Sequence, residues 1–293
     1  MDDFQSIGVN DTKAIKHLDY TFSIVGTMPK GVENPTLEEY IPTRFDKEAC
    51  PNMRFGKDQV FSHCGGVYTQ IGGENAVVTA AHCLITNSKV LKNTSIMREE
   101  ELQRSCDLIK LQRMNRDGSV RDVYDCEAIV AFGFKLNADL AIIKLKPGNS
   151  QLPVDPPRFI EAELQENQKL MGVGFPLGVG PKYNEGKYLS ASDGVIFADM
   201  ASLNKFSDSP VFTDSGDIAG IVHGRDMQNL TFESGNKDFM LDEKEGCFDY
   251  RVYSDRPKLK LFNLYLCGQK HWKNDSLPVA VSYLKEINSS SET

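Results

Sequence analysis

The chain has 293 residues, 40% of them hydrophobic and 25% charged, with a formal net charge of −8 at pH 7. This is the composition of a globular protein, and it suffices for one large domain or two small ones. The negative charge and the lack of a long basic run argue against a nucleic-acid partner. No apolar stretch approaches the ~18 residues of a membrane span, so no such segment is expected.

The compartment is indicated by cysteines and by glycosylation motifs. The first residues lack the basic start and apolar core of a signal peptide, so we expect either an intracellular protein or one whose signal has been removed. Seven cysteines are many for a cytosolic chain. Together with the N-x-S/T motifs, they favour an extracellular or secretory-pathway glycoprotein. These motifs begin at Asn10, Asn93, Asn229, Asn274 and Asn288.

The first 58 residues show no strong periodicity and are interrupted by prolines. We expect an extended or partly helical N-terminal extension that wraps the domain. Within it, Ile24-Val25-Gly26-Thr27 is interpreted as an ordinary edge strand. From residue 59 onward, short strand-like runs alternate with polar turns, which is typical of an all-β barrel or sandwich. The charged segment 86–122 is expected to be a solvated surface of helix or loop.

A histidine follows a short strand in the segment Val77-Val78-Thr79-Ala80-Ala81-His82-Cys83, and Cys64-Gly65-Gly66 precedes it. Valine and threonine favour a strand, which would present His82 at the rim of a sheet. The two segments together resemble the T-A-A-H-C and C-G-G motifs of chymotrypsin-like serine proteases. The resemblance implies that His82 is catalytic and that Cys64 and Cys83 form a disulfide.

The remaining cysteines give weaker expectations. Proximity in sequence suggests the pairs Cys106 with Cys126 and Cys247 with Cys267, which leaves Cys50 as the odd cysteine. We regard only the pair next to His82 as a firm expectation.

An aspartate opens the apolar segment Ala138–Leu145. A buried carboxylate without a partner would cost several kcal/mol, on the order given for uncompensated charges, and a histidine ring supplies a donor. The segment resembles the D-[IL]-A-L-[IL]-[KR]-L strand of the same family. This implies that Asp139 orients the imidazole of His82; the alternative is an aspartate that caps a turn at the start of a strand.

The proline-rich stretch Pro153–Pro157 is interpreted as the linker between two barrels. Further on, the chain predicts a hairpin of strand Pro210–Thr213, turn, and strand Ile218–His223. The region resembles the family's G-x-S-G-[GS]-P segment, and its Ser-Pro-Val-Phe portion is closest to the glutamyl endopeptidase branch. An ungapped alignment through Pro210 places Ser207 on the nucleophile.

Two neighbouring serines follow an aspartate and imitate the nucleophile. Ser215 lies only five residues before Gly220, which places it at the tip of the hairpin. Ser209 would require a deletion of two residues ahead of Pro210. Both therefore rank behind Ser207.

Three residues around the nucleophile depart from the family pattern. Lys205 and Asp208 replace glycines, and a Cβ resists the backbone angles that glycine accepts there. The N–H groups of Lys205 and Ser207 would form the oxyanion hole, and we expect the carboxylate of Asp208 to repel the oxyanion. Loss of one oxyanion donor costs ~10²–10³ in rate. Phe206 replaces the aspartate that captures a new amino terminus in trypsin-like zymogens, so that route of activation is absent.

The resemblance also implies the substrate pocket. Ala201 falls on the pocket floor, so no buried carboxylate would attract lysine or arginine. His223, with Gly224 beside it, falls on the wall strand and suits an acidic or amide side chain; the alternative is a histidine at a strand end. His17, His63 and His271 lack cysteines or carboxylates at zinc-ligand spacing, so we expect no metal and no cofactor.

The expected fold is all-β, with two antiparallel six-stranded barrels of the chymotrypsin-like type. The expected parts are an extension over 1–58, a first barrel over 59–150, and a second barrel over 151–293. That second part includes an insertion over 225–270 and a C-terminal amphipathic helix over 281–287. The expected function is a serine endopeptidase acting on protein or peptide substrates through His82, Asp139 and Ser207. The alternative is a weak or inactive homologue that binds a protein partner or inhibitor.

Overall fold

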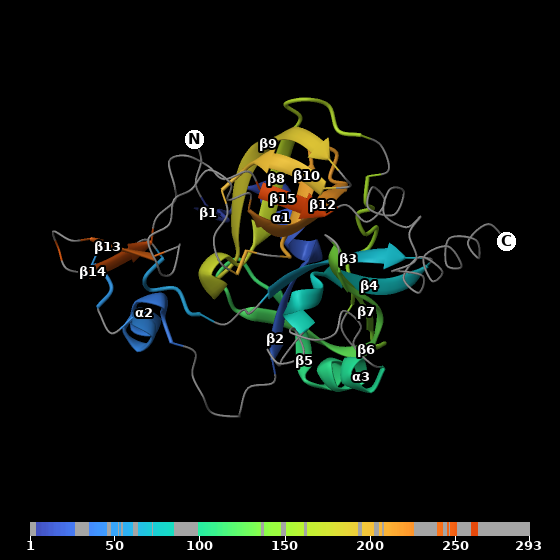
Figure 1. The fold of residues 1–293 in the computed structure, drawn as a ribbon, viewed down its shortest axis with the longest axis horizontal. Coiled ribbons are helices and arrows are strands. Elements are labelled where there is room, and N and C mark those ends of the chain that lie inside the picture. The colour runs from blue at the N-terminus through green and yellow to red at the C-terminus, as the bar shows by residue number, and fades with distance from the viewer. Residues whose placement is uncertain are drawn as a thin grey trace.

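A computed structural model defines the fold. It describes residues 4–26, 35–45, 48–51, 53, 55–60, 64–71, 73–84, 99–135, 138–147, 151–160, 163–192, 195–201, 205–206, 208–225, 239–242, 245, 247–250 and 259–262. Strands dominate this part of the chain (Figure 1), which confirms the all-β expectation. Among the described residues, no helix is both long and apolar enough to cross a lipid bilayer.

The first barrel is a closed ring of six antiparallel strands in the order β2-β3-β4-β7-β6-β5. Closure leaves no unpaired strand edge. Its strands are β2 (Thr21–Gly26), β3 (Cys64–Ile71), β4 (Glu74–Thr79), β5 (Ile109–Met114), β6 (Val120–Lys135) and β7 (Ala138–Leu145).

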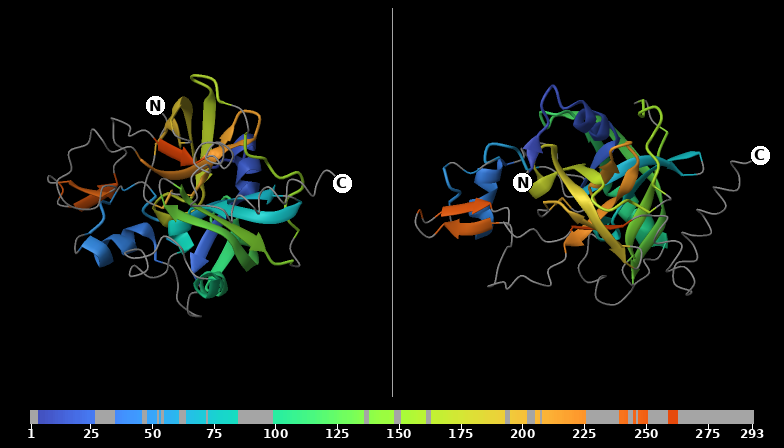
Figure 2. Two further views of the ribbon diagram at one scale, coloured as in Figure 1. Left: turned by 45° about the vertical axis from the view of Figure 1, so that its right-hand side comes forward. Right: turned by 90° about the horizontal axis from the view of Figure 1, so that it is seen from above.

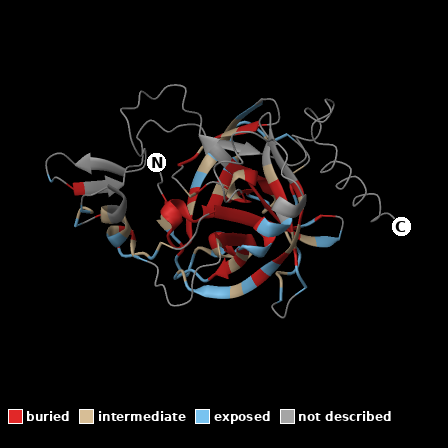
Figure 3. Cartoon of the chain, turned by 60° about the horizontal axis from the view of Figure 1, so that its bottom comes forward, coloured by how far each residue is buried: buried red, intermediate tan, exposed pale blue. Residues whose placement is uncertain are grey.

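Branched and aromatic side chains fill the interior of this barrel. Phe22, Val67, Leu111 and Ile142 are all fully buried and belong to one apolar cluster. Figure 3 shows buried residues over the central strands and exposed residues mainly toward the periphery. These interior side chains remove apolar surface from water, which is the main favourable term in folding.

The second sheet also forms a ring. Its pairings run β9-β10-β15-β12-β11-β8, and β8 pairs back to β9, so six strands close on themselves while β1 joins the outside of β9. This confirms the expectation of two six-stranded barrels. The strands are β1 (Gln5–Ser6), β8 (Lys169–Gly174), β9 (Lys182–Ser192), β10 (Val195–Asp199), β11 (Pro210–Thr213), β12 (Ile218–Arg225) and β15 (Leu259–Phe262).

The expected boundaries of the parts need two corrections. Strand β2 lies inside the segment assigned to the N-terminal extension, yet it pairs with β3 and β5 as a full member of the first barrel. It is therefore not an edge strand. Strand β15 lies inside the segment assigned to the insertion, yet it pairs with β10 and β12 in the second barrel. In both cases distant pairing partners decide the assignment, and the local sequence does not show them.

Shorter elements lie outside the two barrels. A hairpin of β13 and β14 lies with α2 on one flank of the molecule (Figures 1 and 2). The expected C-terminal helix falls outside the described residues. The shorter elements are α1 (Thr12–Tyr20), α2 (Leu37–Phe45), η1 (Ala81–Leu84), α3 (Glu99–Asp107), η3 (Pro176–Gly178), β13 (Phe239–Asp242) and β14 (Cys247–Tyr250).

Helix α1 connects the start of the chain to the second barrel. Lys13 Nζ lies 3.0 Å from Asp214 Oδ1 at the tip of the β11–β12 hairpin. The ring of His17 stacks on Phe212, with centroids 4.1 Å apart and planes 4° apart. Burial, with the positive charges of Lys16 and Lys13, lowers the pKa of His17 from 6.5 to about 4. The histidine is therefore neutral at physiological pH, as a buried stacking partner must be.

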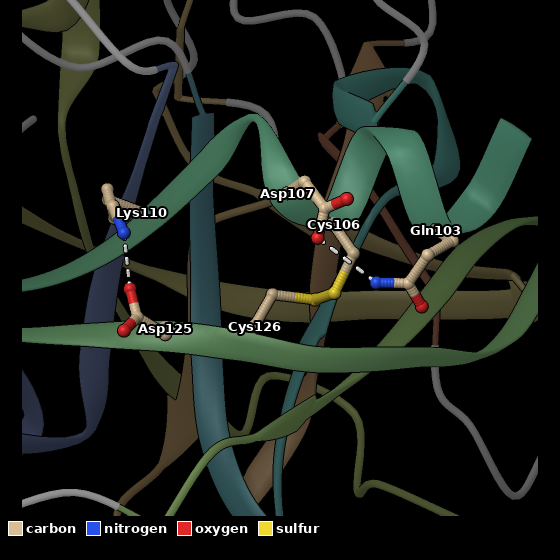
Figure 4. Close-up of a disulfide and its surroundings, with 6 residues drawn as sticks. All are labelled: Gln103, Cys106, Asp107, Lys110, Asp125 and Cys126. Atoms are coloured by element: carbon tan, nitrogen blue, oxygen red, sulfur yellow. Dashed lines mark hydrogen bonds and ion pairs between the residues drawn. A yellow bond between two sulfur atoms is a disulfide. The ribbon is translucent and has the colours of Figure 1, made fainter.

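Three disulfides join the described cysteines, and two of them confirm expectations. These are Cys64–Cys83 and Cys106–Cys126. The second ties α3 to β6 (Figure 4), near an ion pair between β5 and β6. The charged segment thus contains a helix and strands of the first barrel.

The third disulfide corrects an expectation. Cys50 pairs with Cys247 across a sequence separation of 197 residues, so Cys50 is not the odd cysteine and Cys247 does not pair with Cys267. Cys267 lies outside the described residues. Proximity in sequence failed here because folding brings the N-terminal segment against the start of β14.

Candidate active site

His82 lies in η1, directly after β4. The strand ends at Thr79, whose hydroxyl donates to the carbonyl of Gly65 at 2.8 Å and so holds the ends of β4 and β3 together. Ala80 and Ala81 are fully buried, which leaves the half-buried His82 as the first side chain of the segment in reach of solvent. The local sequence therefore fixes the histidine at the rim of the first barrel, as expected.

Asp139 is the second residue of β7, and its backbone approaches η1. Ala141 pairs with Thr79 across β7 and β4. This pair is the last of the β7–β4 ladder, so Asp139, two residues before Ala141, and His82, three residues after Thr79, both lie just beyond the same end of it. The backbone of Asp139 thus lies beside the histidine segment, and its side chain falls outside the described residues.

Ser207 also falls outside the described residues, but the residues on both sides of it are described. The N–H of Asp208 donates to the carbonyl of Val222 at 2.6 Å, and Val222 N–H donates to the carbonyl of Ser209 at 3.0 Å. Ser209 N–H in turn donates to the carbonyl of Phe206 at 3.2 Å. A compact turn joined to β12 therefore flanks the predicted nucleophile.

Lys205 and Asp208, where the resemblance implies glycine, both adopt left-handed backbone angles. The φ angle is +68° at Lys205 and +71° at Asp208. A non-glycine residue in this region costs on the order of 1–3 kcal/mol, and it persists where surrounding contacts impose it. The backbone has therefore kept a shape that suits glycine, although both residues carry side chains.

The side chain of Phe206 anchors this turn. Its ring is fully buried and meets the ring of Phe4 edge to face, with centroids 4.8 Å apart and planes 72° apart. A Cβ built on Gly172 or on Gly174 would come within 3.0 Å of the Phe206 ring. The absence of side chains at both glycines makes room for the ring. The start of the chain therefore packs directly against the residue before Ser207.

The side chain of Asp208 is directed to the first barrel. It is fully buried, and its Oδ2 atom contacts the Sγ atom of Cys83. Ligand-type atoms of Cys64, His82, Cys83 and Asp208 all lie within 4.8 Å of one another. The chain therefore brings the histidine segment and the predicted nucleophile turn to one place, at the junction of the two barrels.

The two imitating serines occupy distinct environments. Ser209 is fully buried against Gly174 and Gly65, and its hydroxyl has no hydrogen-bond partner among the residues that the structure describes. Ser215 lies at the exposed hairpin tip, where its hydroxyl bonds to Thr213 and to Asp217. The Ser209 hydroxyl is therefore closed to solvent, and that of Ser215 is open to it.

The predicted pocket residues lie in the second barrel. Ala201 is 3% exposed, and its carbonyl accepts a 2.6 Å hydrogen bond from the side-chain amide of Asn184. The backbone of His223 sits at a register shift between Val222 and Gly224 in the pairing of β12 with β15. The side chain of His223 falls outside the described residues, so its assignment to the pocket wall stays a prediction.

The sequence matches no family model and no curated protein. Among solved structures, it is similar to the inactive form of Rv3671c from M. tuberculosis H37Rv, a serine-to-alanine mutant, with a TM-score of 0.47 and 11% identity. That alignment covers 92% of this chain and 96% of the other. Human heparin binding protein aligns with a TM-score of 0.49 and 10% identity, over 94% and 99% of the respective chains. At these values neither structure bears on substrate, activity or partners, and the function is inferred below from the chain's own residues.

Proposed function

We propose that the chain is a serine endopeptidase in which Ser207 is the nucleophile, His82 the general base and Asp139 the orienting carboxylate. One observation carries the proposal. The His82 nitrogen and the carboxylate of Asp208, the residue after Ser207, lie within 4.8 Å of each other although they are 126 positions apart. The backbone of Asp139 approaches the same segment through the pairing of β7 with β4.

The chemistry follows from the roles of these groups. The Ser207 hydroxyl attacks the peptide carbonyl carbon while His82 accepts its proton. His82 then donates that proton to the amide nitrogen as the C–N bond breaks and the amine leaves. Water, deprotonated by His82, hydrolyses the acyl-enzyme and regenerates Ser207. Asp139 stabilises the imidazolium and fixes the tautomer.

The oxyanion hole consists, in this proposal, of the N–H groups of Lys205 and Ser207. The φ angle of +68° at Lys205 supports this role, because it keeps the backbone shape for which the family uses glycine. The carboxylate of Asp208 faces Cys83 in the first barrel. Because Lys205 and Asp208 stand where the family has glycines, we expect a weaker oxyanion hole, and therefore turnover that is slow but measurable.

A second candidate function is that of a non-catalytic homologue that binds a protein partner. The side chains at Lys205 and Asp208 favour it, since left-handed backbone at two substituted positions stores strain without an evident gain in rate. In this alternative the surface around Ser207 serves recognition, and the serine never forms a covalent adduct.

A fluorophosphonate probe separates the two functions because it reacts only with an activated serine. The wild-type chain is expected to label, and labelling is lost in Ser207→Ala and in His82→Ala. Ser215→Ala is the matched control and labels like the wild type. Absence of labelling in a folded wild-type chain would contradict the peptidase proposal, and persistent labelling of Ser207→Ala would move the nucleophile elsewhere.

The substrate preference is a further part of the proposal. Ala201 offers no charge to a basic side chain, and His223 suits an acidic or amide one. We expect peptides with glutamate before the scissile bond to be cleaved faster than matched peptides with lysine. Equal or reversed rates would contradict the assignment of His223 to the pocket wall.

A further inference from the structure

Two adjacent glycines of β3, Gly65 and Gly66, face different parts of the molecule. A Cβ atom built on Gly65 would meet the backbone of the second barrel, 3.1 Å from Ser209 N and 3.2 Å from the carbonyl carbon of Asp208. A Cβ atom built on Gly66 would instead lie 2.7 Å from Val77 Cγ1, inside the first barrel. Neither glycine has a positive φ angle, so close packing is what requires them. Gly65 therefore lies at the junction of the two barrels, and Gly66 lies within one of them.

The backbone around Gly65 is fixed to the histidine segment. Cys64, the preceding residue, is bonded in a disulfide to Cys83, which follows His82 in η1. The carbonyl oxygen of Gly65 accepts a 2.8 Å hydrogen bond from the hydroxyl of Thr79, at the end of β4. Because both links end beside His82, a displacement of Gly65 also moves the histidine.

The other side of the contact is fixed to the predicted nucleophile. Ser209 N–H donates to the carbonyl of Phe206 at 3.2 Å, which closes the turn across Ser207. Asp208 N–H donates to the carbonyl of Val222, and Val222 N–H donates to the carbonyl of Ser209. These bonds hold the turn on β12, so the position of Ser207 follows from that of its two neighbours.

A glycine of the second barrel holds the same turn through the side chain of Ser209. A Cβ atom built on Gly174, in β8, would lie 1.8 Å from Ser209 Oγ and 2.5 Å from Ser209 Cβ. The backbone of the fully buried Ser209 thus contacts the first barrel at Gly65, and its side chain contacts the second barrel at Gly174. With a contact to each barrel, the turn cannot shift without disturbing one of them.

We propose that Gly65 is a positioning residue of the active site, because its missing side chain sets the distance between the His82 imidazole and the Ser207 hydroxyl. A methyl group at 3.1 Å from the turn is closer than the usual contact of about 3.5–4.0 Å, so alanine would push the two segments apart by about half an ångström. A misplacement of about 1 Å can cost about 10²-fold in rate, so half that distance corresponds to about tenfold. This role rests on the proposed peptidase function, whereas the packing contact itself does not.

Gly65→Ala tests this role in the full chain, and Gly66→Ala is the matched control. Labelling at several fluorophosphonate concentrations separates the maximal labelling rate from the concentration that gives half of it. For Gly65→Ala we expect the maximal rate per folded molecule to fall about tenfold while the half-saturating concentration is unchanged. A loss of stability alone would change neither value per folded molecule.

The control variant should respond in the opposite way. The new methyl group of Gly66→Ala overpacks the first barrel against Val77, so its urea midpoint should fall while labelling per folded molecule stays at the wild-type rate. A second change, Val77→Ala, removes the colliding methyl group. It should restore part of the urea midpoint in Gly66→Ala and none of the labelling rate in Gly65→Ala.

Hydrogen exchange gives a readout that does not require catalysis. In Gly65→Ala, exchange should accelerate at the amides of Asp208, Ser209 and Val222, whose hydrogen bonds hold the turn. In Gly66→Ala, the acceleration should fall on β3 and β4 and leave these three amides unchanged. A wild-type chain that never labels would contradict the proposed function, and the exchange pattern would still decide whether Gly65 positions the turn.

Two results would overturn the inference. One is a folded Gly65→Ala chain that labels at the maximal rate of a labelling wild type. The other is wild-type exchange at the three turn amides in Gly65→Ala. If this variant does not fold, Ser209→Gly replaces it, with Ser209→Ala as its control because alanine keeps the Cβ atom. Wild-type labelling and exchange in a folded Ser209→Gly chain would equally overturn the inference.

Discussion

Substitution of Phe4 by alanine tests whether the start of the chain positions the nucleophile. The Phe4 ring is fully buried and packs edge to face on Phe206, the residue before Ser207. Removal of a buried phenylalanine side chain costs about 3–5 kcal/mol, and the lost aromatic pair is worth about 1 kcal/mol. We expect the free energy of unfolding to fall by about 3–5 kcal/mol in urea titrations, a total that already includes the aromatic pair.

The fluorophosphonate labelling rate should fall by more than the fraction of folded protein does. Lys205 and Asp208 hold left-handed angles at a cost on the order of 1–3 kcal/mol each, and the Phe206 anchor helps to impose them. Without that anchor the turn relaxes, and we expect the fluorophosphonate labelling rate to drop at least tenfold at a temperature where the variant is fully folded. Hydrogen exchange of segment 205–213 should accelerate in parallel.

Two comparisons make the test sharp. Val9→Ala, at a position 71% exposed, is the control and should change neither stability nor labelling. A small aromatic molecule such as benzene can occupy an apolar cavity, and it should restore part of the labelling in Phe4→Ala. If stability falls as expected while labelling and exchange stay at wild-type rates, the aromatic pair is only structural and the reasoning fails.

The remaining predictions concern other parts of the molecule. Because His17 has a pKa of about 4 in the folded state and about 6.5 when unfolded, stability should fall as pH drops from about 6.5 to about 4, by up to about 3 kcal/mol. Urea midpoints of His17→Gln should lack this part of the pH dependence, and equal slopes would refute the assignment. Lys205→Gly should relieve its positive φ, raising stability by about 1 kcal/mol and the labelling rate; a lower melting temperature would contradict this. Cys50→Ser should lower the free energy of unfolding by about 2–4 kcal/mol. Non-reducing peptide mapping of the wild-type chain should recover the Cys50–Cys247 pair. In secreted material, the exposed Asn10 should carry a glycan. Enzymatic deglycosylation should then lower the mass of Asn10→Gln by one glycan less than it lowers the mass of the wild type.

Features with a local physical cause could be predicted from the sequence. The hairpin after Pro210 follows from two apolar runs around a polar turn, and the structure has β11 and β12 there. The rim position of His82 follows from a strand that ends in two buried alanines. Its neighbouring disulfide, Cys64–Cys83, is present as the resemblance implied.

Features that depend on distant partners could not be predicted. β15 lies in a polar stretch, and its place between β10 and β12 is set by pairing with strands that precede it by tens of residues. Cys50 and Cys247 are joined only by the tertiary fold. The direction of the Asp208 side chain was also beyond reach, because its contact with Cys83 spans both barrels. The contact of Phe4 with Phe206 could not be predicted for the same reason, because the two residues are far apart in the sequence.

The position of β15 has a consequence for how the protein is made. The first barrel takes all its strands from residues 21–145, so it can close while the rest of the chain is still being translated. The second barrel cannot close until residues 259–262 have left the ribosome, and until then β10 and β12 each lack the neighbour that pairs with them. A chain that stalls before this point exposes two open edges, which are ready templates for aggregation. We therefore expect nascent chains truncated at residue 250 to require a chaperone and those truncated at residue 150 to need none.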